Sequence, residues 1–353
     1  MPMRIAHVNV ARGYRGGERQ TELLMRELAE LGYSQRLVAR RGEPLARRLN
    51  DAEVEIRMVS GNPLSVAAAT GGVDLIHVHE GRSVYGAFLR SIISKTPYIL
   101  TRRVNNPIGE HRFAHAAYRR AAYVVAVAPQ VADVVRRYDA RVEVNVIHSG
   151  SSGFIVNKDK VAAIRNTYSG KLLVGHVGAL DNKQKAQEFI IAVARDLQAS
   201  HPDIHFMLVG GGDDEAMLKA SAAGLSNLTF TGFVDNVGDY LAAFDVFVLP
   251  SRKEGIGSIL LDAMEQRLPI IASAVGGVPE IVRDGQNGIL IESERPDQLQ
   301  DAILRLRDAP QLRERLGNQG QRFAKDFTAA VMCRKYVALY QSIAGPMDST
   351  DRH

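Results

Sequence analysis

Residues 246–291 read VFVLPSRKEGIGSILLDAMEQRLPIIASAVGGVPEIVRDGQNGILI, the most informative stretch of the sequence. An apolar run ends at Pro250, a loop with two glycines follows, and a helical pattern begins near Ser258. Two further apolar runs, 269–272 and 288–291, come after that helix. Runs that are apolar without alternation are typical of parallel strands covered by helices on both faces. The stretch therefore predicts part of a doubly wound α/β sheet.

The same alternation of apolar runs and amphipathic helical patterns continues to both ends of the chain. The expected strands are residues 4–10, 35–39, 54–59, 75–79, 98–101, 123–128 and 142–148, then 172–178, 204–210, 227–231, 246–250, 269–272 and 288–291. In 54–59 the polar Glu55 and Arg57 alternate with apolar residues, which predicts a strand nearer a sheet edge. The Ser- and Gly-dense segment 148–157 separates the two series. At about 100–200 residues per domain, we expect two Rossmann-like domains, 1–150 and 151–330, facing each other across a cleft.

Composition excludes several classes of protein. Apolar residues make up 46% and charged residues 24% of the 353, which is ordinary for a soluble globular chain and excludes disorder, a fibre and a disulfide scaffold. The single cysteine, Cys333, forms no intramolecular bridge and favours the reducing cytoplasm. The first apolar run is too short for a signal peptide, and no uncharged run reaches the roughly 18–20 residues of a membrane helix. We therefore expect a cytoplasmic protein, at most peripheral at a membrane.

The net charge of +5 is unevenly distributed. Residues 1–150 hold 22 Lys and Arg against 14 Asp and Glu, whereas residues 151–353 hold 22 against 25. A basic first half suggests an anionic partner, such as a phosphorylated glycan or an acidic membrane face. The alternative is that these arginines only solvate helices. Nucleic acid is disfavoured, because the basic residues are not interleaved with aromatic ones.

The loop after residue 250 contains residues suited to binding a phosphorylated sugar ligand. Glu254 is free to accept hydrogen bonds from sugar hydroxyls, and glycines let a phosphate approach the backbone at a helix start. Asp262, one helical turn in, is placed to reach a ribose. The simpler interpretation is a turn followed by an ordinary surface helix. The proposed donor-binding residues of this loop are Gly255, Ile256, Gly257, Ser258 and Asp262.

This stretch, with Glu254 and Asp262 eight positions apart, resembles the nucleotide-sugar signature of the fourth family of retaining glycosyltransferases (glycosyl transferases group 1). The family motif is Glu, seven residues, Glu, and Asp262 replaces the second Glu. The resemblance covers nearly the whole chain and is most specific over 230–291. It implies the GT-B fold, a donor sugar held by Glu254 and a ribose held by Asp262. It also implies that a C-terminal helix, 331–345, returns to the first domain.

A second match follows the expected strand 172–178. The loop from Gly178 resembles the family loop in which an Arg and a later Lys neutralise the departing diphosphate. Lys185 fits the Lys position, whereas Ala179 replaces the Arg. The missing charge must then come from Lys183, from Lys185 or from an arginine of the first domain. Phe233, after 230–232, lies where the family grips the base. Glycines 210–212 suggest phosphate binding by themselves, but a tight turn is the favoured interpretation.

The first domain offers a smaller set of candidates. Gly16 and Gly17 resemble the family's Gly-Gly loop, which lies beneath the donor phosphate. His79 ends an expected strand at its carboxyl edge, where it either lines the cleft or fills the core. Its neighbour His77 shares the same face, but with no third ligand evident we expect no metal. Arg103 occupies a position where several family members have a His near the sugar, and its planar fork suits a phosphate or an anionic acceptor.

The resemblance implies a retaining, metal-independent hexosyltransferase that needs no cofactor. The donor is a nucleotide diphosphate-sugar, with UDP-sugar favoured over GDP-sugar. The acceptor expected from the basic first domain is a lipid-linked or phosphorylated glycan of bacterial surface polysaccharide, of the lipopolysaccharide type. The proposed catalytic residues are Glu254, Lys185, His79 and Arg103. Two alternatives are a nucleotide-sugar 2-epimerase of the same fold and a nucleotide-sugar-binding protein that has lost catalysis.

Overall fold

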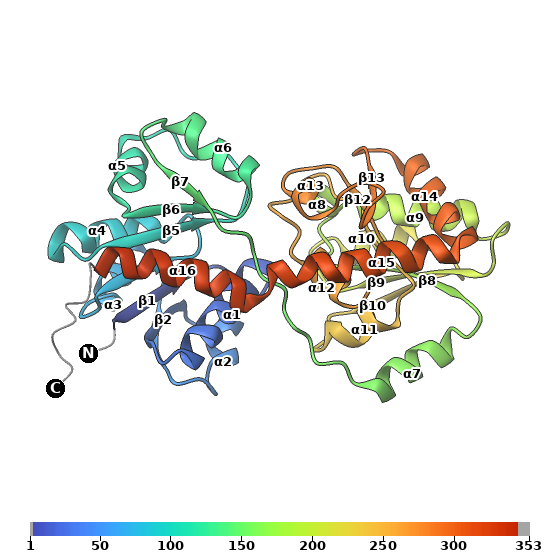
Figure 1. The fold of residues 1–353 in the computed structure, drawn as a ribbon, viewed down its shortest axis with the longest axis horizontal. Coiled ribbons are helices and arrows are strands. Elements are labelled where there is room, and N and C mark those ends of the chain that lie inside the picture. Colours follow the sequence, from blue (N-terminus) through green and yellow to red (C-terminus); the bar gives the residue numbers. More distant parts are fainter. Residues whose placement is uncertain (1–2, 345–353) are drawn as a thin grey trace. The chain divides into compact units, whose positions relative to one another are not determined.

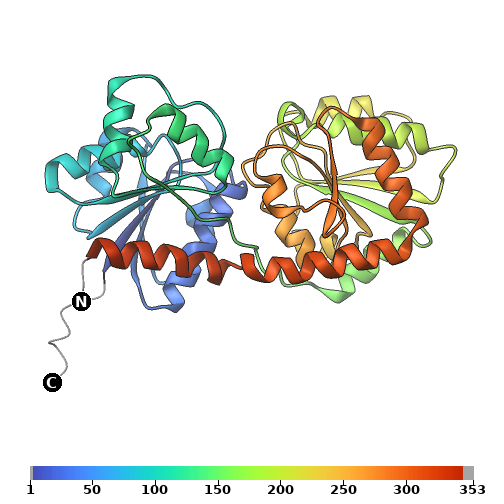
Figure 2. The ribbon, with the colours of Figure 1, turned by 45° about the horizontal axis from the view of Figure 1, so that its top comes forward.

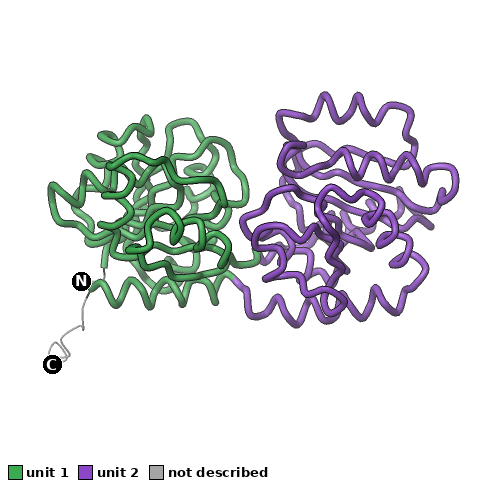
Figure 3. The backbone as a smooth tube through the Cα atoms, turned by 90° about the horizontal axis from the view of Figure 1, so that it is seen from above, with its two compact units in different colours: residues 1–152, 329–353 green, residues 153–328 purple. Residues whose placement is uncertain are grey.

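Two compact units make up the chain in the computed structural model, which describes residues 3–344. The first unit contains the chain up to Ser152 together with the segment from Ala329 onward. The second unit runs from Gly153 to Thr328 (Figure 3). Each unit is a parallel sheet with helices on both faces, as Figures 1 and 2 show.

The sheet of the first unit has seven strands in the order β3-β2-β1-β4-β5-β6-β7, all paired in parallel. The strands are β1 (Arg4–Asn9), β2 (Ser34–Arg40), β3 (Val54–Val59), β4 (Leu75–Val78), β5 (Tyr98–Arg102), β6 (Tyr123–Ala126) and β7 (Val144–Val146). The helices are α1 (Gly16–Glu30), α2 (Pro44–Arg48), α3 (Pro63–Ala69), α4 (Val84–Ser94), α5 (Arg112–Arg120), α6 (Pro129–Tyr138) and α16 (Ala329–Ala344).

The sheet of the second unit has six strands in the order β10-β9-β8-β11-β12-β13, again all parallel. The strands are β8 (Leu172–Val177), β9 (Ile204–Val209), β10 (Leu228–Gly232), β11 (Val246–Leu249), β12 (Ile270–Ser273) and β13 (Gly288–Ile291). The helices are α7 (Lys158–Thr167), α8 (Asn182–Lys185), α9 (Gln187–Leu197), α10 (Glu215–Ser221), α11 (Val237–Ala243), α12 (Ile259–Glu265), α13 (Val278–Ile281), α14 (Pro296–Asp308) and α15 (Pro310–Ala324), with a short 3₁₀ turn, Lys325–Phe327.

The strand patterns agree with the layers. All four residues of β11 are buried, because helices cover both faces of the sheet. The alternating strand β3 lies at the edge of the first sheet, as predicted, and there Glu55 pairs with Arg36 and Arg57. The prediction of a strand over 142–148 was too long. The Val142 amide bonds the carbonyl oxygen of Asp139 in a turn, so β7 begins only at Val144.

The helix α16 covers one face of the first sheet. Tyr336 and Tyr340 on α16 are fully buried in a cluster with residues of α1 and of the central strands. Figure 2 shows α16 in dark red beside the blue elements of the first unit. Across residues 3–344, every helix is either too short or too polar to cross a membrane.

Each sheet has one place where the strand order reverses direction. In the first unit the reversal falls between β1 and β4, and in the second between β8 and β11. The connections that follow the two strands run to opposite sides of the sheet. The loops at the carboxyl ends of those strands therefore diverge and leave a crevice between them. In the second unit these are the loop after β8, which includes α8, and the loop after β11, which contains Glu254.

Candidate active site

Lys185 and Glu254 meet at the reversal point of the second sheet. Lys185 ends the single turn α8, and Glu254 lies in the loop between β11 and α12. Lys185 Nζ is 2.5 Å from Glu254 Oε1, and both side chains are largely covered, with 17% and 6% of their surfaces exposed. The sequence predicted each residue separately, and the fold brings them together as an ion pair.

A second donor fixes the Glu254 carboxylate. Ser251 Oγ donates to the same Oε1 over 2.7 Å. Two donors on one buried carboxylate offset the free-energy cost of removing it from water. The carboxylate is therefore held in one orientation within a loop, the kind of arrangement that suits recognition of a ligand hydroxyl.

His176 lies near this pair, and the sequence analysis missed it. It is fully buried in β8, and its Nδ1 donates to the carbonyl oxygen of Val248 over 3.0 Å. Burial lowers the pKa of His176 to about 4, so the ring is neutral near pH 7. Its other ring nitrogen lies 3.4 Å from the side-chain amide of Gln187, which in turn donates to the carbonyl oxygen of Ala179. His176 therefore supports the start of the Lys185 loop.

The glycine loop after Glu254 is tightly packed. Gly257 has a φ of +67°, which disfavours any side chain there, and a Cβ on it would lie 3.1 Å from the Leu260 side chain. Ile256 and Asp262 are buried, the latter in α12 one turn after Ser258. Gly255 accepts a bond from the Gly277 amide over 2.8 Å. The backbone of this loop thus has a fixed course past Glu254.

The remaining predicted donor residues of the second unit differ in their surroundings. A Cβ on Gly178 would lie 3.9 Å from Lys185 Cε, so Gly178 borders the ion pair. Lys183 is exposed on α8, and Phe233 is 68% exposed just after β10. Lys185 rather than Lys183 is therefore the lysine of this loop that reaches Glu254.

The glycines 210–212 have a packing role. A Cβ on Gly210 would lie 2.1 Å from the carbonyl oxygen of Gly178, and one on Gly212 would lie 2.5 Å from that of Leu180. Only glycine permits this close approach of two backbones. This loop braces the segment that leads into α8, which agrees with the favoured interpretation of a tight turn.

Comparison with known proteins finds one family that matches part of the chain. The model of the family described as "Glycosyl transferases group 1" matches residues 171–309, the part that contains Lys185 and Glu254. Over that segment the chain resembles the group 1 glycosyltransferases.

Relatives match the chain over both of its units. It is 29% identical over 270 residues to an uncharacterized glycosyltransferase of Methanocaldococcus jannaschii, covering 73% of this chain and 72% of that protein. It is 24% identical over 347 residues to the lipopolysaccharide core biosynthesis glycosyltransferase LpsE of Rhizobium meliloti, covering 96% and 99%. The crystal structure of Anabaena HepE in complex with UDP-glucose has a TM-score of 0.85 at 19% identity, covering 96% of this chain and 100% of that one. The chain therefore has the predicted GT-B fold.

The first unit contains an arginine whose guanidinium has no hydrogen-bond partner among residues 3–344. This is Arg103, which follows β5, and all three of its guanidinium nitrogens are buried. A Cβ on Gly17 would lie 3.6 Å from Arg103 Cδ. Arg103 therefore packs against the first turn of α1, which begins with Gly16 and Gly17. Burial lowers the pKa of Arg103, with Glu18 acting in the opposite direction. A buried, unpaired guanidinium is costly and indicates a site for an anion.

Three histidines lie together in the first unit, and His7 is the one that the sequence analysis missed. The parallel register sets His7 of β1 opposite His77 of β4, and all three rings are buried. His7 Nδ1 and His79 Nε2 are 3.0 Å apart. In retrospect, alternation along two adjacent strands was a signal for this cluster.

The histidine cluster is better described as a hydrogen-bond network than as a metal centre. The ring nitrogens lie within 4.8 Å of one another, close enough to share an ion. However, both nitrogens of His77 already have hydroxyl partners, Tyr340 at 2.7 Å and Thr101 at 2.8 Å. Besides burial, the charge of Arg103 lowers the pKa of His77 and His79, and the same charge opposes a second cation. The catalytic role predicted for His79 stays a prediction.

Proposed function

We propose that the protein is a retaining glycosyltransferase that moves a sugar from a UDP-sugar to an acceptor hydroxyl. The observation that carries this proposal is the ion pair of Lys185 and Glu254 beside the glycine loop, within the segment that matches the family. The complex of the structural neighbour HepE with UDP-glucose supports UDP over GDP as the donor nucleotide. The second unit would hold the donor and the first unit would present the acceptor.

Each side chain of the second unit has a separate task in this proposal. Glu254 accepts hydrogen bonds from donor-sugar hydroxyls, and Lys185 neutralises the leaving diphosphate. Asp262 bonds the ribose, and Phe233 borders the base. The amides of residues 255–258 contact the phosphate oxygens, to which Lys183 adds exposed positive charge.

The departing diphosphate is stabilised without a metal in this proposal. Positive charge and main-chain amides aimed at a developing anion lower the barrier, because they need no reorganisation during the reaction. The leaving phosphate itself then takes the proton of the acceptor hydroxyl, on the same face of the sugar, so the configuration is retained. Activity should therefore persist in excess EDTA, and its loss and recovery with Mg²⁺ or Mn²⁺ would contradict this part.

Arg103 supports an anionic acceptor. Its buried fork has no partner among the described residues, and residues 1–150 carry an excess of eight basic side chains. The relative LpsE acts in lipopolysaccharide core biosynthesis. We therefore propose a phosphorylated or lipid-linked glycan of bacterial surface polysaccharide as the acceptor, with its anionic group at Arg103.

A peripheral membrane contact through the first unit is part of the proposal. Ile92 and Ile93 on α4 are 54% and 73% exposed, and Arg90 and Lys95 lie within a few residues of them. Exposed apolar side chains beside cations suit an anionic lipid surface. Binding to phosphatidylglycerol vesicles that is lost in Ile92→Asp/Ile93→Asp would support the contact, and unchanged binding would contradict it.

Product analysis tests the function directly. The protein is incubated with UDP-, GDP- and ADP-sugars and a crude lipopolysaccharide-type acceptor, and the products are resolved by chromatography and NMR. Transfer releases UDP and leaves the anomeric configuration of the sugar unchanged. An isomeric nucleotide-sugar would instead establish an epimerase, and binding without turnover would establish a nucleotide-sugar-binding protein.

A further inference from the structure

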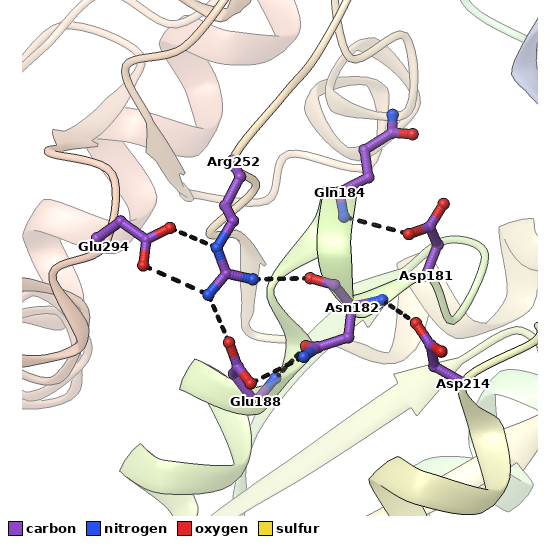
Figure 4. Close-up of polar contacts among 7 residues, drawn as sticks. All are labelled: Asp181, Asn182, Gln184, Glu188, Asp214, Arg252 and Glu294. Carbon is purple, nitrogen blue, oxygen red and sulfur yellow. Dashed lines mark hydrogen bonds and ion pairs between the residues drawn. The ribbon is translucent and has the colours of Figure 1, made fainter.

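Arg252 connects the two loops that carry Lys185 and Glu254. It lies two positions before Glu254, and its Nη1 donates to the carbonyl oxygen of Asn182 over 2.8 Å. Its own main-chain amide donates to the carbonyl oxygen of Gln184 over 2.8 Å. Both acceptors belong to α8, which ends at Lys185. Figure 4 shows the bond from Arg252 to Asn182. One residue therefore joins the Glu254 loop to the Lys185 turn.

Two carboxylates hold the guanidinium in this orientation. Glu188 of α9 pairs with Nη2, and Glu294, which follows β13, pairs with Nε. The hydrogen bond to Glu294 raises the pKa of Arg252, and the bond from Arg252 lowers the pKa of Glu188. The guanidinium carbon also lies 4.8 Å from the centre of the Phe189 ring. The fork is thus fixed from three sides (Figure 4).

The turn that carries Lys185 depends on outside contacts. α8 has four residues, and a single helical turn is not stable by itself. The Asn182 side-chain amide donates to the Glu188 carboxylate over 2.8 Å. Its side-chain oxygen accepts a bond from the Glu188 main-chain amide over 2.9 Å. The Asn182 amide donates to Asp214 over 2.7 Å. The Arg252 bonds tie α8 to the Glu254 loop, together with a longer bond of 3.3 Å from the Lys253 amide to the Gln184 carbonyl oxygen and the Lys185–Glu254 ion pair itself.

The chemistry of this contact requires an arginine. The guanidinium donates in three directions at once, to a carbonyl and to two carboxylates, which a lysine ammonium on a flexible stem does not reproduce. Glu188 and Glu294 are 44% and 58% exposed, so the ion pairs themselves add little to the free energy of unfolding. The main effect of the contact is therefore on the position of α8 relative to the Glu254 loop.

We propose that Arg252 is a positioning residue that holds Lys185 against Glu254 and thereby sets the affinity of the second unit for the donor diphosphate. This inference rests on the proposed function, because it assigns Lys185 to the diphosphate. Arg252 acts through Lys185 and Glu254 and does not itself contact the donor.

The test compares Arg252→Lys and Arg252→Ala with the control Arg295→Ala. Arg295 is a neighbouring arginine whose ion pairs, with Glu292 and Asp297, do not involve α8. Titration calorimetry measures the binding of UDP and of uridine to each full-length variant. We expect both Arg252 variants to bind UDP about tenfold more weakly, a loss of about 1.4 kcal/mol. Uridine binding, and UDP binding to the Arg295 variant, should equal wild type.

A double-mutant cycle separates positioning from a general loss of structure. If Arg252 acts through Lys185, Arg252→Ala should have no further effect on UDP binding in a Lys185→Ala background. Thermal unfolding of Arg252→Lys verifies that the variant is folded. Additive losses in the double mutant, equal loss of uridine binding, or unchanged UDP binding in both Arg252 variants would each overturn the inference.

The same titration distinguishes this failure from failure of the proposed function. Wild-type protein that binds none of UDP, GDP and ADP would contradict the proposed function and this inference with it. Wild-type protein that binds UDP, with Arg252 variants that bind it equally well, would contradict only the role of Arg252.

Discussion

Lys185 and Glu254 are 69 positions apart in sequence, and their charged atoms lie 2.5 Å apart at the carboxyl edge of the second sheet. Each satisfies the other's charge where little water reaches them. A donor that used both residues would have to exchange part of this ion pair for contacts of its own. The pair therefore keeps two charges ionised and in place before any donor arrives, at some cost to affinity.

Replacing Glu254 should separate activity from stability. Glu254→Gln keeps the shape but loses the negative charge, and we expect transfer to fall roughly 10- to 100-fold through loss of charge-assisted hydrogen bonds to the sugar. Because the residue lies in a loop, the melting temperature should change by only a few degrees. Initial rates and thermal unfolding measure the two effects, and Ser251→Ala, which removes only one supporting bond, should lose less activity. Full activity in Glu254→Gln would remove the central claim.

Lys185→Ala should weaken binding of the diphosphate and spare the nucleoside. A partly desolvated charge-assisted contact is worth roughly 1.5–3 kcal/mol, which corresponds to about 10- to 150-fold in affinity for UDP. Calorimetry with UDP and with uridine measures the difference. Ala179→Arg should partly restore UDP binding, since it returns the family's second charge.

Lys183→Ala is the matched control for that prediction. Lys183 belongs to the same turn but is exposed, so its removal should change UDP affinity by less than about threefold. If the losses are reversed between the two variants, the assignment to Lys185 is wrong while the fold assignment stands.

Replacing Arg103 should raise the stability of the protein and weaken its binding of the acceptor. Arg103→Met removes a buried, unpaired charge, and we expect the melting temperature to rise by roughly 2–4 °C for each kcal/mol gained. Transfer to a phosphorylated acceptor should fall at least tenfold, with donor affinity unchanged. The neighbouring Arg102 bonds Tyr118 and the carbonyl oxygen of Asn106, so Arg102→Met should instead lower the melting temperature. A melting temperature that falls equally in both variants would contradict the role given to Arg103.

His176 should make the second unit sensitive to acid. Its pKa is about 4 when folded and about 6.5 when unfolded, so the unfolded chain binds more protons between these values. The stability that this group contributes is present above pH 6.5 and is lost as the pH falls toward 4, by at most roughly 3 kcal/mol. Denaturant unfolding at several pH values should show a shallower decline in His176→Gln than in wild type. Parallel curves for the two proteins would contradict the assignment.

The strands and the course of the glycine loop were predictable, because they depend on local patterns. Apolar runs such as VFVL are buried on both faces, and the glycine loop with Glu254 is contiguous in sequence. The pairing of Lys185 with Glu254 was not predictable, since it depends on which strands are neighbours. His7 and His176 were hidden within apolar runs, where one histidine attracts no notice until its partners are known.

The contacts of Arg252 could not be predicted from the sequence either. In the sequence it is one of two basic residues between Ser251 and Glu254, and nothing local distinguishes it from Lys253. Only the fold reveals that Arg252 is bonded to two other segments while Lys253 is exposed.

The place of α16 in the first unit has a consequence for synthesis on the ribosome. Tyr336 and Tyr340 bury His77 and Thr101, yet they are translated after the entire second unit. Translation proceeds from the N-terminus, and domains ordinarily fold in the order in which they emerge. Here the first sheet emerges with one apolar face covered by α1 but without α16, and this last helix is made only after the second unit is completed. The first unit, although it is translated first, can complete its fold only after the second unit has been translated.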